Sequence, residues 1–357
     1  MKMPKVVLGF VDKCEPWKVQ SRLFPSKVGG KPAWLSLKQV PSSDQLTCET
    51  CNKVMMFLCQ IYAPIESGPQ LIRNFHRTIF VFLCRTVTCN KNQQITSFKI
   101  FRSTLPRENE FYSANPPELV DDPTFDVAKW INMCNLCGIA ADKKCGRCKR
   151  AMYCSKEHQT LDWKKGHKLN CSTDSTTNSE STFLFPEREL VNEEEVLDEK
   201  CMSEEQAVAE FHKLKDDGKI GTLAHLPESE LESHVFKNDD ETFSEFTDRI
   251  SEYPDQVIRY DRGGAPLLIA DSPLPSNIPN CEYCGQTRQF EFQIMPQLLY
   301  ELHELVLDWG ILLIFTCKDS CIGDSINSYK KEFVFRQDVT NVDIKSNQAT
   351  DEKKTFN

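Results

Sequence analysis

Residues 29–61 read GGKPAWLSLKQVPSSDQLTCETCNKVMMFLCQI, and the chain repeats the main features of this stretch near its other end. Residues 263–294 read GGAPLLIADSPLPSNIPNCEYCGQTRQFEFQI. Each copy joins a Gly-Gly-x-Pro turn to a Cys-x2-Cys pair and then, nine residues later, to Gln-Ile. Similarity of a chain with itself indicates two structural units of one type.

Both copies continue in the same way. A short apolar run follows, Ile79 to Leu83 in the first and Ile311 to Phe315 in the second, and a cysteine closes each run. Such runs are typical of fully buried strands. Each unit ends in Phe-x-Phe-Arg or a near copy, at residues 98–102 and 333–336. One unit is too small to bury a sufficient core. We therefore expect an α+β, mostly β fold in which two duplicated half-domains pack as one pseudo-twofold domain.

The chain has 357 residues, 17 cysteines and a formal net charge of −9. No signal-peptide pattern opens it, and no apolar run approaches the ~18 residues that a membrane span requires. We expect a cytoplasmic and nuclear protein that does not contact membranes. Thiols stay reduced in those compartments, so the cysteine count indicates metal binding in preference to disulfides.

The eight cysteines of the two repeats have the form of zinc ribbons, in which two pairs at strand ends share one ion. The sets are Cys48, Cys51, Cys84 and Cys89, and Cys281, Cys284, Cys317 and Cys321. The alternative is that they are small buried apolar residues, because the closing pairs are spaced more loosely than a standard pair. Six of the other nine cysteines fall in a second cluster, described next, which leaves Cys14, Cys59 and Cys201. Cys59 lies in an apolar stretch and is expected in the core, and nothing in the sequence marks the other two as nucleophiles.

A second cluster lies between residues 134 and 171. It comprises Cys134, Cys137, Cys145, Cys148, Cys154, His158, His167 and Cys171. Eight ligands in four spaced pairs fit two tetrahedral zinc sites with no open position. The segment is too short and polar to hold its own core, so zinc would supply its folding free energy, about 10–16 kcal/mol per ion.

This cluster resembles the MYND zinc finger in every ligand and spacing, and also in Tyr153, Gln159 and Trp163. The resemblance implies an interleaved arrangement in which Cys134, Cys137, Cys154 and His158 hold one ion and the other four ligands hold the second. It also implies binding of peptides, often proline-rich, with Gln159 and Trp163 near the groove. The segment carries a net charge of +6. A basic patch can bind nucleic acid, but in a MYND-like finger we interpret it as a solvated face and expect no direct nucleic-acid contact.

Acidic residues concentrate between Glu187 and Glu252, a stretch that contains 21 Asp/Glu and seven Lys/Arg. A Ser/Thr/Asn run at residues 172–181 precedes this stretch and is typical of a linker. Two helical patterns fall within it, one that begins at Ser203 and one that includes Phe243, Phe246 and Ile250. The segment is either a solubilising, partly disordered insert or an electrostatic arm for a basic ligand.

These features predict five regions. They are a β half-domain with its cysteine set (1–115), the finger (130–172), an acidic linker with short helices (173–255), a second β half-domain with its cysteine set (256–340) and a tail (341–357).

The order of these regions and several motifs resemble the programmed cell death protein 2 family. The motifs include residues 24–35 (FPSKVGGKPAWL), 153–163 (YCSKEHQTLDW), 256–260 (QVIRY), 291–298 (EFQIMPQL) and 308–311 (DWGI). The resemblance covers nearly the whole chain except the acidic insert and the tail.

The family resemblance implies a dedicated chaperone. Its members capture a newly made ribosomal protein two of the small subunit, keep the basic N-terminal extension of that client soluble, and so support 40S maturation. An acidic segment suits such a client. We expect the protein to be a monomer, with a client-binding face near Trp34, Tyr62, Tyr260 and Trp309.

Two other functions compete with this one. The first is a transcriptional co-regulator that recruits proline-rich peptides through its finger. The second is an enzyme, because MYND fingers also occur in protein methyltransferases. The sequence has no Gly-rich cofactor loop, and closed zinc sites leave no position for an activated water. We therefore expect no enzymatic activity.

Overall fold

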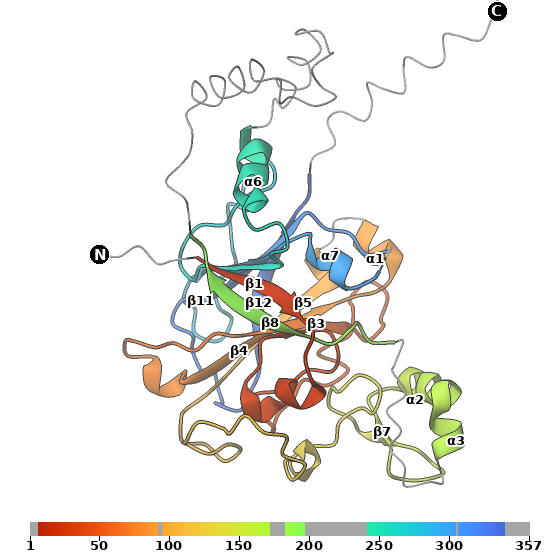
Figure 1. The fold of residues 1–357 in the computed structure, drawn as a ribbon. Helices are drawn as coiled ribbons and strands as arrows, with labels where there is room; N and C mark the ends of the chain where they lie inside the picture. Colours follow the sequence, from red (N-terminus) through yellow and green to blue (C-terminus); the bar gives the residue numbers. More distant parts are fainter. Residues whose placement is uncertain (1–5, 92–94, 172–182, 197–240, 305, 340–357) are drawn as a thin grey trace, which may run out of the picture.

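The computed structural model describes residues 6–91, 95–171, 183–196, 241–304 and 306–339. Strands from both ends of the chain form one closed antiparallel barrel (Figure 1), in the order β1-β8-β2-β3-β4-β5-β12-β11-β10-β9. The fold is thus mostly β, as expected. The barrel strands are β1 (Val7–Asp12), β2 (Lys27–Val28), β3 (Met56–Tyr62), β4 (His76–Leu83), β5 (Phe98–Leu105), β8 (Arg188–Glu194), β9 (Ile258–Tyr260), β10 (Arg288–Ile294), β11 (Ile311–Cys317) and β12 (Lys330–Gln337).

Helices are few and short in the described residues. The α-helices are α1 (Val87–Lys91), α2 (Lys156–Asp162), α3 (Lys168–Asn170), α6 (Glu241–Ser251) and α7 (Leu298–Glu301), and the other helical segments are single 3-10 or π turns. A two-stranded sheet, β6 (Lys143–Lys144) with β7 (Met152–Tyr153), belongs to the finger. Helix α6 carries the predicted stripe of Phe243, Phe246 and Ile250 and packs it against the barrel. None of the helices described has the length and apolar character needed to cross a membrane.

The two repeats form equivalent parts of the barrel. Strands β3-β4-β5 and β10-β11-β12 are each consecutive antiparallel neighbours, and the two triplets meet where β5 pairs with β12. The apolar runs predicted to be buried strands are β4 and β11, and every residue of both runs is buried. A β-bulge interrupts β3 between Phe57 and Cys59, and another interrupts β10 between Phe290 and Phe292. Each bulge begins six residues after its Cys-x2-Cys pair, so the repeated sequence has a repeated conformation.

A glutamine fixes the loop after each Gly-Gly turn. Gln60 accepts a hydrogen bond from the backbone N–H of Ala33 at 2.8 Å and donates to the carbonyl of the same residue at 3.2 Å. Gln293 bonds Leu267 in the same way, at 2.8 and 3.0 Å. The turns need glycine because Gly29, Gly30 and Gly263 have φ of 64°, 64° and 80°, a region that other residues rarely adopt.

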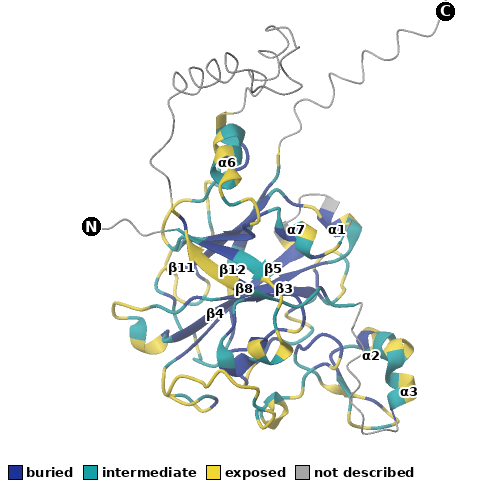
Figure 2. Ribbon diagram, in the orientation of Figure 1, coloured by how far each residue is buried: buried dark blue, intermediate teal, exposed yellow. Residues whose placement is uncertain are grey.

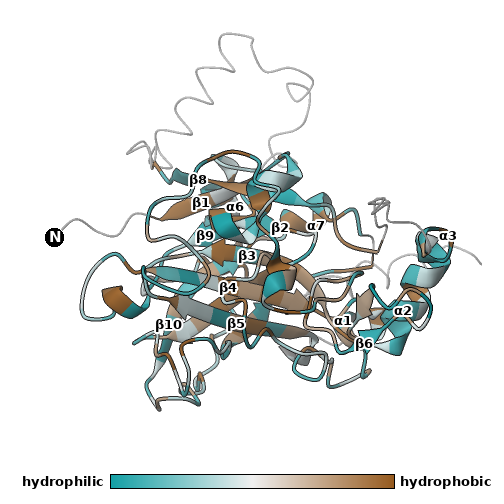
Figure 3. Cartoon of the chain, turned by 90° about the horizontal axis from the view of Figure 1, so that it is seen from below, coloured by the Kyte–Doolittle hydropathy of each residue, from teal (hydrophilic) through white to brown (hydrophobic). Residues whose placement is uncertain are grey.

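Three apolar clusters stabilise the molecule. The first fills the barrel interior with side chains such as Ile79, Val81, Ile314 and Val334. The second joins the outer face of β3–β5 to the finger through Trp34, Phe80 and Phe82. The third lies between α6 and the outer face of β10 and β11. Figure 3 shows the apolar barrel strands beside the more hydrophilic helices of the finger. The finger is therefore anchored to the barrel by a shared apolar core.

One part of the expected acidic linker is a barrel strand. Residues 188–194 form β8, which pairs with β1 from Glu189 to Glu194 and with β2 at Arg188 and Glu189. Leu190 is buried while residues 191–194 are exposed, so β8 is the exposed strand in Figure 2. The amino-acid composition did not predict this strand, because Leu190 is its one residue in the interior core. The predicted linker at 172–181, the helix from Ser203, Cys201 and the tail at 341–357 lie outside the described residues.

Candidate metal centres

Sixteen cysteine and histidine side chains come together in four groups of four. The groups are Cys48, Cys51, Cys84 and Cys89; Cys134, Cys137, Cys154 and His158; Cys145, Cys148, His167 and Cys171; and Cys281, Cys284, Cys317 and Cys321. Within each group the sulfur and nitrogen atoms lie within 4.8 Å of one another. These are the four sets that the sequence predicted, including the interleaved pairing of the finger.

The spacing of the sulfur atoms suits zinc. Two thiolates bound to one zinc ion at about 2.3 Å in tetrahedral geometry lie about 3.8 Å apart. The Sγ–Sγ distance is 4.0 Å between Cys48 and Cys89 and 3.5 Å between Cys51 and Cys84. In the C-terminal group it is 3.6 Å between Cys281 and Cys321. In the finger, Cys145 and Cys171 are separated by 3.8 Å. The donor sets and distances therefore fit closed tetrahedral zinc sites.

All four Cys-x2-Cys turns have the same backbone conformation. In each turn, the N–H four residues after the first cysteine donates to the carbonyl of that cysteine at 2.9 Å. The donating residues are Asn52, Gly138, Lys149 and Gly285, with φ of 56°, 75°, 56° and 73°. The N–H of the first cysteine is also bonded, at 2.8 or 2.9 Å, to a carbonyl five or six residues onward. The turn therefore orients both sulfurs of a pair toward one point.

Strand ends supply the second half of each ribbon group. Cys84 directly follows β4 and Cys89 lies on α1, whereas Cys317 ends β11 and Cys321 follows it by one turn. Strands β4 and β11 run in opposite directions, because three antiparallel pairings separate them. The two ribbon groups therefore lie at opposite ends of the barrel. The pKa of Cys317 is lowered to about 4, chiefly by a hydrogen bond with the thiol of Cys321. A lowered pKa favours the thiolate, which is the form that binds zinc.

The finger places its histidines by two different turns. Ser155 caps α2 by accepting a hydrogen bond from the N–H of His158 at 3.0 Å, and this helix brings His158 to within 3.1 Å of the Cys154 sulfur. After α2 the helix widens over Trp163–His167, where Gly166 has φ of 156°. This widened turn brings the Nε2 atom of His167 to within 3.6 Å of the Cys148 sulfur.

The finger also bonds directly to the N-terminal half of the barrel. Trp34 is fully buried, and its indole N–H donates to the carbonyl of Gly138 at 2.6 Å. The N–H of Ala140 donates to the carbonyl of Pro41 at 3.3 Å. These contacts hold the first Cys-x2-Cys turn of the finger against the barrel.

The structure does not bring the four aromatic residues of the expected client face together on one surface. Trp34 is buried between barrel and finger, and Trp309 is buried in the barrel interior, where its N–H bonds the carbonyl of Met295 at 3.4 Å. Tyr62 bonds His76 at 3.0 Å, and Tyr260 bonds Glu291 at 2.8 Å. Gln159 and Trp163 are different, because both are partly exposed on or beside α2.

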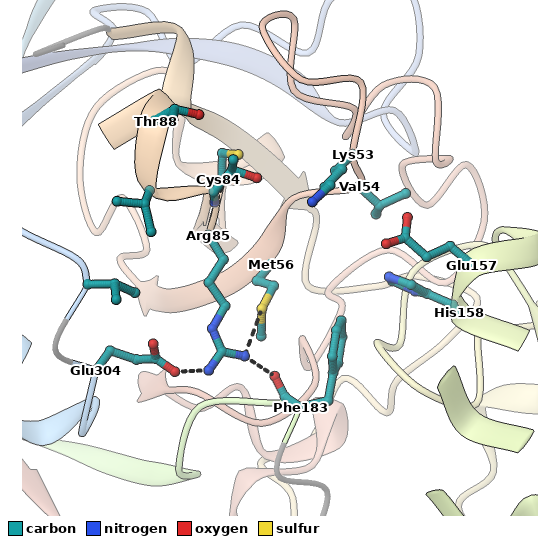
Figure 4. Close-up of a pocket in the computed structure, with 13 residues that line it drawn as sticks. Lys53, Val54, Met56, Cys84, Arg85, Thr88, Glu157, His158, Phe183 and Glu304 are labelled. Atoms are coloured by element: carbon teal, nitrogen blue, oxygen red, sulfur yellow. Dashed lines mark hydrogen bonds and ion pairs between the residues drawn. The ribbon is translucent and has the colours of Figure 1, made fainter. Parts of the chain in front are cut away.

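A groove of about 620 Å³ lies beside the finger. Figure 4 shows that Cys84, Arg85 and Met56 line it from the barrel and that Glu157 and His158 line it from the finger. Arg85 crosses its floor, where it forms an ion pair with Glu304 and donates to the carbonyl of Phe183 at 3.0 Å. One ligand from each of two candidate metal groups therefore faces the same groove.

The barrel interior contains charges that sequence reasoning missed. Arg77 and Glu291 are fully buried and form a two-pronged ion pair at 2.6 and 2.7 Å. Burial raises the pKa of Glu291, but Arg77 and Arg262 outweigh this effect and lower it to about 2. A second fully buried pair joins Arg102 to Glu332 at 2.7 Å. Both pairs join strands of the N-terminal half to strands of the C-terminal half.

An acidic surface lies where β8 and α6 meet. We call it the acidic junction and define it by five exposed carboxylates, Glu193, Glu241, Glu245, Asp248 and Glu252. The two elements are joined by the buried Glu195, which binds Arg249 and Arg259 at 2.8 Å. Glu195 balances one of the two arginine charges, so the five exposed carboxylates leave this surface with a net excess of negative charge.

Comparisons with known proteins agree with this architecture. Three family models match the chain: Programmed cell death protein 2, N-terminal domain (residues 5–119); MYND finger (134–171); and Programmed cell death protein 2, C-terminal putative domain (240–338). Programmed cell death protein 2 of Bos taurus is 42% identical, over 93% of this chain and 96% of its own, and that of Mus musculus is 39% identical, over 94% and 97%. The probable 20S rRNA accumulation protein 4 of Schizosaccharomyces pombe is 33% identical over 23% of this chain and 24% of its own. No solved structure matches.

Proposed function

This chain belongs to the programmed cell death protein 2 family, and from that membership we propose that it is a zinc-stabilised chaperone. Its client is a newly made, basic protein of the small ribosomal subunit, ribosomal protein two, whose capture supports 40S assembly. The name of the Schizosaccharomyces pombe relative refers to 20S rRNA and supports a role in ribosome biogenesis. The chain works as a monomer in the cytoplasm and the nucleus, and it neither catalyses a reaction nor binds nucleic acid or membranes.

The acidic junction is the observation that carries this proposal. Its five exposed carboxylates lie on two adjacent elements and outnumber the two local arginines, one of whose charges is balanced by Glu195. An excess of surface charge of one sign accelerates encounter with a chain of the opposite sign. A newly made basic extension carries that opposite sign, and charge pairing with the junction keeps it soluble.

Zinc has a structural role in this proposal. The MYND finger implies zinc, and we propose one ion in each of its two groups and one in each four-cysteine group. All four sites are closed by four protein ligands, so the metal would stabilise the fold without activating a substrate. We also propose that the two halves arose by duplication and pack about a pseudo-twofold axis, which the matched bulges and glutamine contacts support.

A charge-reversal experiment tests the client proposal. Glu193→Lys, Glu245→Lys and Glu252→Lys are combined in the full chain, and binding to the newly synthesised client is measured at several salt concentrations. We expect the association rate to fall at least tenfold at low salt and to lose most of its salt dependence. The matched control is Glu66→Lys, Glu108→Lys and Asp121→Lys, which changes the net charge equally at exposed sites elsewhere. An equal decrease of the association rate in both triple variants would refute a role for the acidic junction.

A second candidate function is a transcriptional co-regulator that binds proline-rich peptides. The partial exposure of Gln159 and Trp163 favours it. Co-translational capture followed by quantitative mass spectrometry separates the two candidates. Enrichment of the ribosomal client supports the chaperone, whereas enrichment of chromatin factors that is lost on Trp163→Ala supports the co-regulator.

A further inference from the structure

The two halves of the barrel meet where β1 pairs with β9 and where β5 pairs with β12, and the second of these seams is short. Strands β5 and β12 share only three paired positions, from Arg102 opposite Lys330 to Ile100 opposite Glu332, whereas β4 and β5 share eight. Two arginines occupy equivalent places at this seam, because Arg102 and Arg336 end the repeated Phe-x-Phe-Arg motifs. Each of them reaches away from its own half.

Arg102 crosses to the C-terminal four-cysteine group. Its guanidinium donates to the carbonyl of Cys321 at 2.9 Å and lies 4.0 Å from the sulfur of the same residue. It also donates to Glu332 at 2.7 Å, and neither side chain of this pair is exposed. A full positive charge from the N-terminal half therefore contacts a ligand of the C-terminal group.

Glu332 extends this contact to the other ligands. Its second oxygen accepts a hydrogen bond from the N–H of Cys317 at 3.1 Å and another from Arg288 at 3.0 Å. Arg288 in turn donates to the carbonyl of Asn280, the residue before Cys281, at 2.7 Å. The buried pair thus connects the backbone at or beside three of the four ligands and leaves only the exposed Cys284 outside.

Arg336 makes the reverse crossing. It donates to the carbonyl of Asn90, which follows the ligand Cys89, at 2.8 Å. The side chain of Asn90 donates to the carbonyl of Cys84, another ligand, at 2.6 Å. Asp338 holds Arg336 in place at 2.8 Å. Each half therefore contributes one arginine to the ligand loops of the other half.

We propose that Arg102 and Arg336 form a reciprocal clasp that couples zinc binding in each four-cysteine group to closure of the barrel seam. The inference rests on the proposal that both groups hold zinc. Four thiolates around one Zn²⁺ leave two negative charges, and a desolvated guanidinium favours that state. Hydrogen bonds to ligand loops also position the sulfurs, and loss of such contacts typically lowers metal affinity 10–100-fold. Coupling is mutual, so bound zinc must strengthen the seam by the same factor by which the seam strengthens zinc binding.

The test measures zinc loss from each group separately in the full chain. The protein is mixed with a zinc chelator and an alkylating reagent, and mass spectrometry follows alkylation of each cysteine. We expect Arg102→Met to accelerate loss from the group of Cys317 and Cys321 by 10–100-fold and to leave the group of Cys48 and Cys51 unchanged. Arg336→Met should do the reverse, by a smaller factor because Arg336 contacts no ligand directly.

Controls separate coupling from simple destabilisation. Arg259→Met breaks a different buried ion pair, in which Arg259 contacts Glu195 and Gln256 and no residue of a ligand loop, and should accelerate loss from both groups equally. Arg102→Lys retains the charge but cannot make both hydrogen bonds, so it provides a milder variant if Arg102→Met folds poorly. Cys284→Ser, which removes one exposed ligand, should increase hydrogen exchange at the paired residues of β5 and β12.

The outcomes distinguish the clasp from the zinc proposal. Native mass spectrometry that finds two zinc ions in the wild-type chain, both in the finger, overturns both. Four zinc ions with equal acceleration of both groups by Arg102→Met, or with no acceleration, overturns the clasp alone. Selective loss from opposite groups in the two arginine variants supports it.

Discussion

Replacing Arg77 by Met should destabilise the protein by about 3 kcal/mol at pH 7. The substitution leaves Glu291 buried with Tyr260, Thr316 and Arg262 as its remaining partners. Removing one member of a buried ion pair costs about 3–5 kcal/mol, and the remaining partners favour the lower end of that range.

The pKa of Glu291 determines how the contribution of this pair depends on pH. Its ordinary value of 4.5 falls to about 2 in the folded protein, where Arg77 is the largest favourable influence against the opposing effect of burial. A lowered folded pKa stabilises the protein above the unfolded pKa of 4.5 and loses that effect as pH falls toward 2. In the wild-type protein this contribution should therefore be constant between pH 6 and pH 8.

The assay is urea unfolding in a buffer with fixed free zinc, which keeps metal loss from contributing to the difference. The control Arg73→Met removes an exposed arginine and should change the free energy of unfolding by less than about 0.5 kcal/mol. The double variant Arg77→Met with Glu291→Gln leaves no unpaired buried carboxylate and should recover at least about 1 kcal/mol relative to Arg77→Met. A single-variant loss below about 1 kcal/mol, or a double variant no more stable than the single one, would refute the reasoning.

Three further predictions concern the turns, the finger and the metal. Gly29→Ala should destabilise the protein by more than about 1 kcal/mol in thermal unfolding, because φ is 64° and the added Cβ would lie 2.0 Å from the carbonyl oxygen of Pro186; unchanged stability would contradict this strain. Trp34→Phe removes the hydrogen bond to Gly138, so limited proteolysis should cut the finger faster while the barrel stays intact; an unchanged cleavage rate would show that apolar packing alone holds the finger. His158→Ala should release one zinc ion per chain and leave the other three, as counted by native mass spectrometry; release of both finger ions would show that its two sites fill cooperatively.

Sequence reasoning reached the metal groups because their ligands are identified by residue type and spacing. Cys48 and Cys84 are 36 residues apart, yet the repeat at Cys281 and Cys317 shows the same separation. The sequence also predicted strands β4 and β11, because all of their residues are buried and their apolar runs are continuous.

Other parts of the molecule had no such signal. Buried and exposed residues do not alternate along β8, and only one of its residues lies in the interior core. Its acidic composition therefore suggested a linker. The buried Arg77 and Glu291 are 214 residues apart and belong to residue types that are usually exposed. Trp34 is predicted on a client-binding face of the repeats, but its N–H bonds the finger inside a core that only the assembled fold creates. Pairings of this kind depend on topology, which one sequence does not reveal.

The position of β1 in the barrel has a consequence for synthesis of the chain. Val7 pairs with Glu194 on one side and with Tyr260 on the other. At about 5–20 residues per second, the ribosome needs about 10–40 s to make the roughly 190 residues between β1 and its first partner. Throughout that interval β1 has unpaired edges on both sides, and such edges invite pairing with other chains. A protein that we propose protects unfinished ribosomal proteins must therefore itself remain open until late in its own translation.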